Sequence, residues 1–216
     1  MKNINTKLIL FDVDNTLVFG EEAEAFYRLY PGALERALAR QLNASESRAK
    51  EIADEFRANF NGRGELAFES LGLGSEPWYE AVCGLEPRRY LKPLPAVRNV
   101  LDKIRRNDIR IGVVTNGPTI QSKNILRQVG IKDDIFAPFI GWEKGMPFPK
   151  DGSGKIFLDI AERYGTDPQE MIMIGDSLNT DILPAQKAGL RTVHITEKQA
   201  PQTEQYRTIR SVEQLP

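Results

Sequence analysis

Short apolar runs alternate with segments of helical periodicity along most of the chain. Each run is a few residues long and largely apolar on successive positions, which is typical of a strand buried on both faces. The predicted strands are Leu8–Phe11, Ile109–Thr115, Met171–Gly175 and Arg191–Ile195. The predicted helices carry the apolar stripes that begin at Val97, Ile120, Ile156 and Leu178. Because strands and helices alternate, we predict βαβ units and an α/β fold with a parallel sheet flanked by helices.

The stretch from about Glu21 to Tyr90 shows no strand pattern and is predicted to be helical. A first helix is predicted through Phe26, Leu29 and Tyr30, and Pro31 is predicted to open a second helix. Asn43 and Glu46 resemble a capping box ahead of a third helix through Ile52. A turn at Asn61–Gly64 and short helices at Leu66–Leu71 and Pro77–Cys83 are predicted to follow. We therefore predict an all-helical insert of roughly seventy residues, a normal size for a domain. The predicted boundaries are 19–90 for the insert and 1–18 with 91–216 for the α/β core.

The composition is that of a globular protein and narrows the range of partners. The chain has 216 residues, of which 41% are hydrophobic and 27% are charged, with a net charge of -1. No polybasic stretch resembles a nucleic-acid-binding surface, and no segment is long and apolar enough to cross a membrane, so we expect neither partner. The single cysteine, Cys83, excludes an internal disulfide and fits a reducing compartment. The first residues do not resemble a signal peptide, so we expect a cytoplasmic protein.

Two aspartates, Asp12 and Asp14, follow the first predicted strand within the segment Asp12–Thr16. Carboxylates two residues apart can converge where a strand opens into a loop, and there they repel each other. A hard cation such as Mg²⁺ would relieve that repulsion, because it prefers oxygen ligands. Asp and Asn are also common in ordinary turns, but the position directly after a buried strand favours a functional site.

Two more strand ends carry polar groups suited to the same site. Thr115 and Asn116 follow an apolar run, where a hydroxyl and backbone amides can hold phosphate oxygens at a helix N-terminus. Asp176 stands at the end of another run, and Asp181 lies one or two helical turns later, so it can point back. Each segment alone is compatible with an ordinary βα turn or a helix cap. Together they bring acids and a hydroxyl to one edge of a sheet, where the sites of parallel sheets form.

These segments resemble the motifs of the haloacid dehalogenase-like superfamily. The resemblance rests on FDVDNTL at 11–17, VVTNG at 113–117 and IGDSLNTDI at 174–182, and it covers almost the whole chain. It implies a Rossmannoid core, a helical cap of the C1 type inserted after the first motif, and an aspartyl-phosphate mechanism. It also implies that Asp176 binds Mg²⁺ and that Asp181 supports the metal site from behind its direct ligands.

The resemblance further implies roles for the residues of the first two motifs. Asp12 would attack phosphorus and also bind Mg²⁺. Asp14 would protonate the leaving oxygen and then activate water, and its backbone carbonyl would reach the metal. Thr115 and the backbone of Asn116 would bind the transferred phosphoryl group.

A lysine of the family pattern has no direct counterpart in this chain. That lysine usually precedes a proline in a GKPxP segment, and GMPFP at 145–149 matches the frame with Met146 in the lysine position. Three lysines lie nearby, and a long side chain can supply the charge from a shifted position. We select Lys150, which follows the proline pair, with Lys144 as the second choice and Lys155 expected inside the next helix.

The predicted function is hydrolysis of a small phosphate monoester, such as a sugar phosphate, a nucleotide or a phosphoglycolate-like compound, by a monomer or homodimer. Three alternatives stay open on the sequence. A phosphomutase would differ only in its substrates, and a non-catalytic binding protein would be consistent with the displaced lysine. A haloacid dehalogenase needs no acid two residues after its nucleophile, so Asp14 argues against it. The only histidine, His194, is predicted to be packed or at the surface rather than catalytic.

Overall fold

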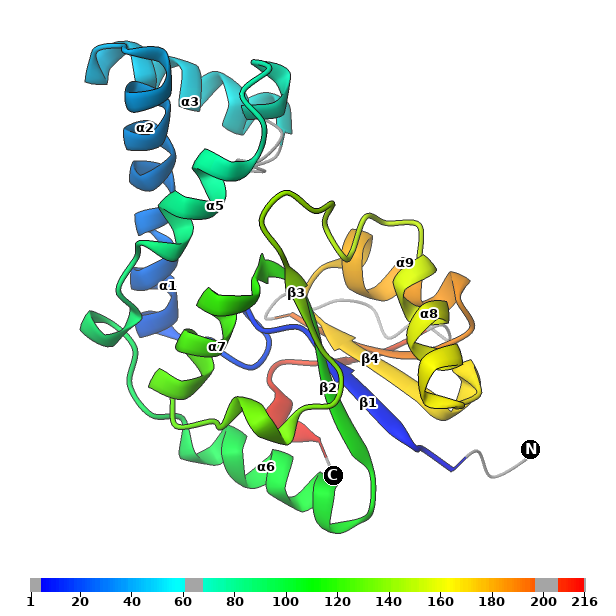
Figure 1. Ribbon diagram of the computed structural model, residues 1–216. Helices are drawn as coiled ribbons and strands as arrows, with labels where there is room; N and C mark the ends of the chain where they lie inside the picture. The colour runs from blue at the N-terminus through cyan, green and yellow to red at the C-terminus, as the bar shows by residue number, and fades with distance from the viewer. Residues whose placement is uncertain (1–4, 61–67, 197–205, 216) are drawn as a thin grey trace.

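A parallel sheet forms the centre of the protein. The computed structural model describes residues 5–60, 68–196 and 206–215. In this part of the chain, six strands join in the order β3-β2-β1-β4-β5-β6, and all neighbouring pairs are parallel (Figure 1). The strands are β1 (Leu8–Phe11), β2 (Arg110–Pro118), β3 (Phe139–Trp142), β4 (Met171–Gly175), β5 (Arg191–Ile195) and β6 (Arg207–Ile209). The predicted α/β fold is therefore confirmed.

The sequence pattern does not predict two of these strands, β3 and β6. β3 is four residues long and includes Gly141, and its first two residues are half-buried. β6 has three residues of mixed polarity. Both strands lie at the ends of the strand order. An edge strand pairs on one side only, so it need not show the continuous apolar run that marks a central parallel strand.

Helices cover both faces of the sheet because successive strand residues point to opposite sides. The flanking helices are α6 (Pro95–Arg106), α7 (Thr119–Gln128), α8 (Lys155–Tyr164) and α9 (Leu183–Lys187). Ile9 and Phe11 of β1 share a core with apolar residues of α6 and α7. Leu8 and Leu10 share a second core with residues of α8 and α9. The sheet is therefore the middle layer of three.

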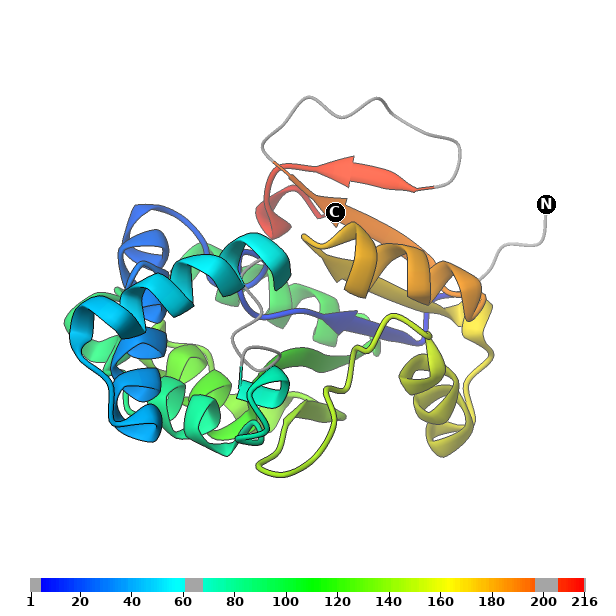
Figure 2. The same ribbon diagram turned by 90° about the horizontal axis from the view of Figure 1, so that it is seen from above.

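An all-helical unit, here called the insert, interrupts the chain between β1 and α6. Its helices are α1 (Glu21–Tyr27), α2 (Leu29–Leu42), α3 (Glu46–Phe60) and α5 (Glu76–Cys83). Figures 1 and 2 show these helices beyond one end of the sheet. Leu38, Ala53 and Trp78 belong to a separate apolar core that the insert builds mostly from its own residues. The insert leaves the sheet at the carboxyl end of β1, so it stands over that edge. The exact limits 1–18, 19–90 and 91–216 stay a prediction.

Two details of the insert differ from the sequence prediction. α2 begins at Leu29, and Pro31 lies within its first turn, where a missing N–H costs no helical hydrogen bond. The capping box at Asn43 is wrong, because Asn43 ends α2 in the left-handed conformation with φ 49°. Asn tolerates that conformation better than most residues do. α3 is capped instead by Ser45, whose hydroxyl accepts from the Arg48 N–H at 3.3 Å.

The remaining helical segments can be compared directly with the prediction. The helix predicted at Pro77–Cys83 is confirmed as α5. The turn predicted at Asn61–Gly64 lies outside the described residues, as does the start of the helix predicted at Leu66–Leu71, of which residues 68–70 are helical. The helix predicted from Leu178 starts as a π-helical turn (Leu178–Ile182) and continues as α9. Short 3₁₀ turns occupy Pro87–Arg89, Asp133–Ile135, Pro168–Glu170 and Val212–Gln214. Among the described residues, none of the helices has the length and apolarity that a membrane crossing demands.

Candidate active site

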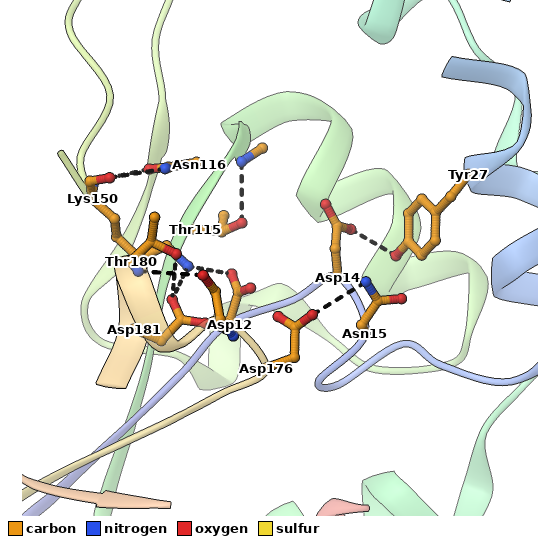
Figure 3. Close-up of polar contacts among 12 residues, drawn as sticks. Asp12, Asp14, Asn15, Tyr27, Thr115, Asn116, Lys150, Asp176, Thr180 and Asp181 are labelled. Atoms are coloured by element: carbon orange, nitrogen blue, oxygen red, sulfur yellow. Dashed lines mark hydrogen bonds and ion pairs between the residues drawn. The ribbon is translucent and has the colours of Figure 1, made fainter. Parts of the chain in front are cut away.

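The predicted site residues meet at the carboxyl edge of three adjacent strands (Figure 3). Asp12 directly follows β1, Thr115 and Asn116 lie in the last part of β2, and Asp176 directly follows β4. β1 pairs with both β2 and β4, and the Asp12 N–H donates to the Ile174 carbonyl at 2.9 Å. The sheet therefore brings segments that are far apart in the sequence to one place.

Three carboxylates crowd together at this edge. Asp12, Asp176 and Asp181 each offer an oxygen, and these oxygens lie within 4.8 Å of one another. Burial raises the pKa of Asp176 to about 7, and the charges of Asp12 and Asp181 add to the effect. Burial likewise raises the pKa of Asp181 to about 6. Full ionisation of the cluster therefore needs positive charge close by.

Lys150 supplies one such charge from the loop between β3 and α8. Its ammonium Nζ lies 2.8 Å from Asp12 Oδ1 and 2.5 Å from Asp181 Oδ1. Burial by itself would lower the pKa of Lys150, but the charges of Asp12 and Asp181 outweigh it and raise that pKa. The Lys150 side chain is almost fully buried, so the ammonium is held charged inside the acid cluster. The Ser177 N–H holds Asp181 from the other side at 3.0 Å.

The other residues considered for the lysine position lie elsewhere. Lys144 is exposed and pairs with Glu80 of α5, with 2.5 Å between Nζ and Oε1. Lys155 begins α8, as predicted, and its ammonium pairs with Asp159 on the surface of that helix. Met146, which takes the place of the family's lysine in the GMPFP segment, is 60% exposed and does not contact the acids. Among these residues, the structure brings only Lys150 to the acids.

The Asn116 side chain fixes the backbone of Lys150. Its Nδ2 donates to the Lys150 carbonyl at 3.0 Å, and its Oδ1 accepts from the Lys150 N–H at 2.8 Å. A carboxamide presents a donor and an acceptor side by side, so it can pair with both polar groups of one residue's backbone. The sequence motif suggests only a backbone role for Asn116. This side-chain contact has no local signal, because its partner lies in another loop.

Asp14 lies apart from the acid cluster and faces the insert. The Tyr27 hydroxyl of α1 donates to Asp14 Oδ1 at 2.6 Å (Figure 3). Burial, followed by the charge of Asp12, raises the pKa of Asp14 to about 6. Asn15, with a left-handed φ of 55°, turns its Nδ2 toward Asp176 Oδ2 at 3.3 Å. The sequence predicts Tyr27 only as one of several aromatic residues of the insert, most of them core, because nothing in its helical pattern marks it as a partner of Asp14.

Thr115 and Gly117, at the carboxyl end of β2, complete the group of residues at the bottom of the site, here called the polar floor. Thr115 is 1% exposed, and its hydroxyl accepts from the Gly117 N–H at 3.1 Å. A side chain on Gly117 would press against the Ser122 hydroxyl and approach Asp14, so glycine keeps this space open. His194, predicted to be either packed or at the surface, is buried, and its Nε2 lies 3.0 Å from the backbone carbonyl oxygen of Asp176. The floor therefore combines three acids, one ammonium and one hydroxyl at a sheet edge.

Comparison with known proteins identifies the family to which this arrangement belongs. A model of the haloacid dehalogenase-like hydrolases matches residues 6–189. The chain belongs to this family. The prediction from the three motifs is therefore confirmed at the level of the family and of a hydrolase.

Relatives of this hydrolase cover nearly its whole length. It is 30% identical over 197 residues to the glyceraldehyde 3-phosphate phosphatase of Methanopyrus kandleri. The aligned region covers 88% of this chain and 83% of the relative. It is 28% identical to the phosphoglycolate phosphatase of Vibrio vulnificus strain CMCP6, over 88% of this chain and 83% of the relative. Among solved structures, a HAD phosphatase from Thermococcus onnurineus has a TM-score of 0.66 at 26% identity, covering 96% of this chain and 94% of that one.

The two hydrogen bonds between the Asn116 side chain and the Lys150 backbone, here called the clamp, generate a first prediction. Asn116→Ala removes both hydrogen bonds, each contributing about 0.5–1.5 kcal/mol net. We expect kcat for p-nitrophenyl phosphate to fall on the order of tenfold, because each tenfold in rate corresponds to about 1.4 kcal/mol in the barrier. Steady-state kinetics on both proteins measure this loss.

Asn107→Ala is the matched control for this variant. The Asn107 side chain also donates to a backbone carbonyl, that of Lys103 at 2.9 Å, but it does so at the end of α6. We expect this variant to keep the kcat of the wild type. An Asn116→Ala protein with unimpaired kcat would contradict the positioning role of the clamp.

Proposed function

We propose that this hydrolase is a Mg²⁺-dependent phosphatase that hydrolyses a small phosphate monoester through a phosphorylated Asp12. The observation that carries the proposal is the environment of Asp12. It stands at the end of β1 against the Lys150 ammonium, with Asp176 and Asp181 beside it. The relatives are named as phosphatases of glyceraldehyde 3-phosphate and of phosphoglycolate, which agrees with the predicted class of phosphoric monoester hydrolases acting on small phosphorylated metabolites.

The proposed reaction proceeds in two steps through a covalent intermediate. In the first step, a carboxylate oxygen of Asp12 forms a bond to phosphorus, and the bond from phosphorus to the substrate's alcohol oxygen breaks. Asp14 gives its proton to that leaving oxygen. In the second step, Asp14 takes a proton from water, whose oxygen attacks phosphorus and releases inorganic phosphate and Asp12. Thr115 and backbone amides of the β2 edge hold the phosphoryl oxygens, and Lys150 offsets their charge.

The residues at this edge fit a magnesium ion. Three carboxylates face one ammonium, so the cluster carries surplus negative charge, and carboxylate oxygens are the donors that Mg²⁺ prefers. Asp12 Oδ1 is buried, and the Lys150 ammonium lies 2.8 Å from it. Asp12, Asp176 and the backbone carbonyl of Asp14 would hold the ion, and Asp181 would support them. When bound, the ion would neutralise charge on the phosphoryl oxygens.

The alternatives named from the sequence are less well supported by these observations. A non-catalytic role is favoured only by the lack of a lysine at the position of Met146, and the Lys150 ammonium lies 2.8 Å from Asp12 Oδ1. A haloacid dehalogenase has no use for an acid held as Asp14 is held by Tyr27. A phosphomutase would return the phosphoryl group to an organic hydroxyl, so release of inorganic phosphate separates it from the proposed phosphatase.

The role of Asp12 is tested by Asp12→Asn. An amide is a very weak nucleophile, so we expect no detectable release of phosphate from p-nitrophenyl phosphate. The substitution is close to isosteric, and circular dichroism should report a folded protein. Turnover resembling that of the wild type would overturn the proposed mechanism.

The role of Lys150 is tested by Lys150→Met, with Lys144→Met and Lys155→Met as matched controls. We expect kcat at saturating Mg²⁺ to fall about a hundredfold or more for Lys150→Met, the scale of a lost charge-stabilising group. Lys144 and Lys155 make exposed ion pairs, which contribute little, so those variants should stay near the wild-type rate. Near-normal kcat in Lys150→Met would refute the assignment.

The metal site is tested by thermal unfolding as well as by activity. An ion that binds only the folded protein raises the melting temperature, so Mg²⁺ should stabilise the wild type and EDTA should abolish turnover. Asp176→Ala should lose most of the Mg²⁺-induced shift, whereas Asp159→Ala, on the surface of α8, should keep it. Full activity in excess EDTA would rule out the metal requirement.

A further inference from the structure

Aromatic side chains wall the pocket above the catalytic residues. The pocket has a volume of about 280 Å³, and Asp12, Asp14 and Lys150 lie among the residues that line it. The insert contributes Tyr30 and Trp78, and the end of β3 with its following loop contributes Trp142 and Phe148. Rings thus approach the catalytic residues from the insert and from the α/β core.

These rings are held in defined orientations. Tyr30 and Trp78 meet edge to face, with 6.1 Å between ring centroids. Trp142 and Phe148 stack with centroids 4.6 Å apart and an interplanar angle of 26°. Trp142 is 1% exposed, and its indole N–H donates to the Met146 carbonyl at 2.8 Å. Side chains that are already ordered lose little entropy when a ligand binds between them.

The described part of the pocket lining offers little positive charge beyond the phosphate position. Among its described lining residues, Lys150 is the only basic one, and its ammonium already contacts Asp12 and Asp181. The neighbouring Lys144 pairs with Glu80 and does not line the pocket. An uncharged group therefore suits this described part of the lining better than a second anionic group, whose burial without a partner is costly.

We infer that the substrate is a phosphate monoester whose alcohol carries one planar, unsaturated and uncharged ring. Its phosphoryl group lies at Asp12, and its ring lies among Tyr30, Trp78 and Phe148. Aromatic pairs contribute about 0.5–1.5 kcal/mol beyond burial of their area. A volume near the lower end of the range for ligand pockets, about 300–1,000 Å³, favours a single ring. This inference rests on the proposed phosphatase function and names its substrate class.

This class differs from the substrates in the names of the relatives. Glyceraldehyde 3-phosphate and phosphoglycolate carry no ring, and phosphoglycolate carries a carboxylate in addition to its phosphate. The aromatic walls match neither compound. The chain would therefore share its catalytic floor with those relatives and differ in the group it selects.

Three phosphates of primary alcohols test the inference, because their leaving groups are chemically alike. They are benzyl phosphate, cyclohexylmethyl phosphate and phosphoglycolate, and the measurement is kcat/KM for each with saturating Mg²⁺. We expect benzyl phosphate to exceed cyclohexylmethyl phosphate about two- to tenfold, the value of one aromatic contact. We expect it to exceed phosphoglycolate by about a hundredfold or more, since phosphoglycolate has no ring and would place a carboxylate against the aromatic walls.

Variants of the rings locate the source of the preference. Phe148→Leu and Trp78→Leu should each bring the ratio of benzyl to cyclohexylmethyl phosphate toward one. Phe139→Leu is the matched control, because Phe139 begins β3 and packs against Phe136 rather than lining the pocket. That variant should keep the ratio of the wild type. The ratio compares two substrates on one protein, so partial loss of folded protein does not change it.

The outcomes separate this inference from the proposed function. Turnover of p-nitrophenyl phosphate that depends on Asp12, combined with equal or better kcat/KM for phosphoglycolate, would overturn the inference alone. A benzyl preference that survives both ring variants would also overturn it, because the rings would not be its cause. Failure to hydrolyse any of the four phosphates would overturn the proposed function and the inference with it.

Discussion

The ion pairs of Lys150 with Asp12 and Asp181 are the interaction on which the rest of the site depends. Carboxylate oxygens within 4.8 Å of one another repel strongly when they are withdrawn from water. One buried ammonium offsets part of that repulsion, and removing one partner of such a buried pair typically costs about 3–5 kcal/mol. The position of Lys150 is accordingly over-determined: Asn116 binds its backbone, and Ser177 binds the far side of Asp181.

The segment that carries Lys150 also connects the α/β core to the insert. It starts at Trp142, which belongs to the apolar core of the insert although it lies in β3. Lys144 pairs with Glu80 of α5, and Phe148 stacks on Trp142. The buried ammonium of Lys150 and the Phe148 ring of the pocket wall therefore come from one loop. On the proposed function, a change in that loop would alter both the chemistry and the selection of substrate.

The central strands and the flanking helices could be predicted because their residues are buried in a regular way. β1 and β4 are buried on both faces, so their sequences are almost uninterrupted apolar runs. The edge strands β3 and β6 escaped prediction because each has a neighbour on only one side. The predicted capping box at Asn43 was wrong for a different reason. Asn suits both a helix N-cap and a left-handed helix end, and only the observed backbone, with φ 49°, distinguishes them.

The sequence by itself determined which acids gather at the sheet edge. Asp12 and Asp176 directly follow buried parallel strands, and the carboxyl ends of such strands must meet. Lys144, Lys150 and Lys155 all lie near the motif, and the sequence favoured Lys150 without excluding Lys144. Only the tertiary structure shows that Lys150 contacts the acids. Gly152 and Gly154 adopt left-handed conformations that let the loop turn Lys150 inward, while Lys144 faces the insert. The contact between Asp14 and Tyr27, and the rings around the pocket, were likewise decided by tertiary packing. They join residues of separate elements, and hydrophobic periodicity reports only that a side chain is buried, not what it meets.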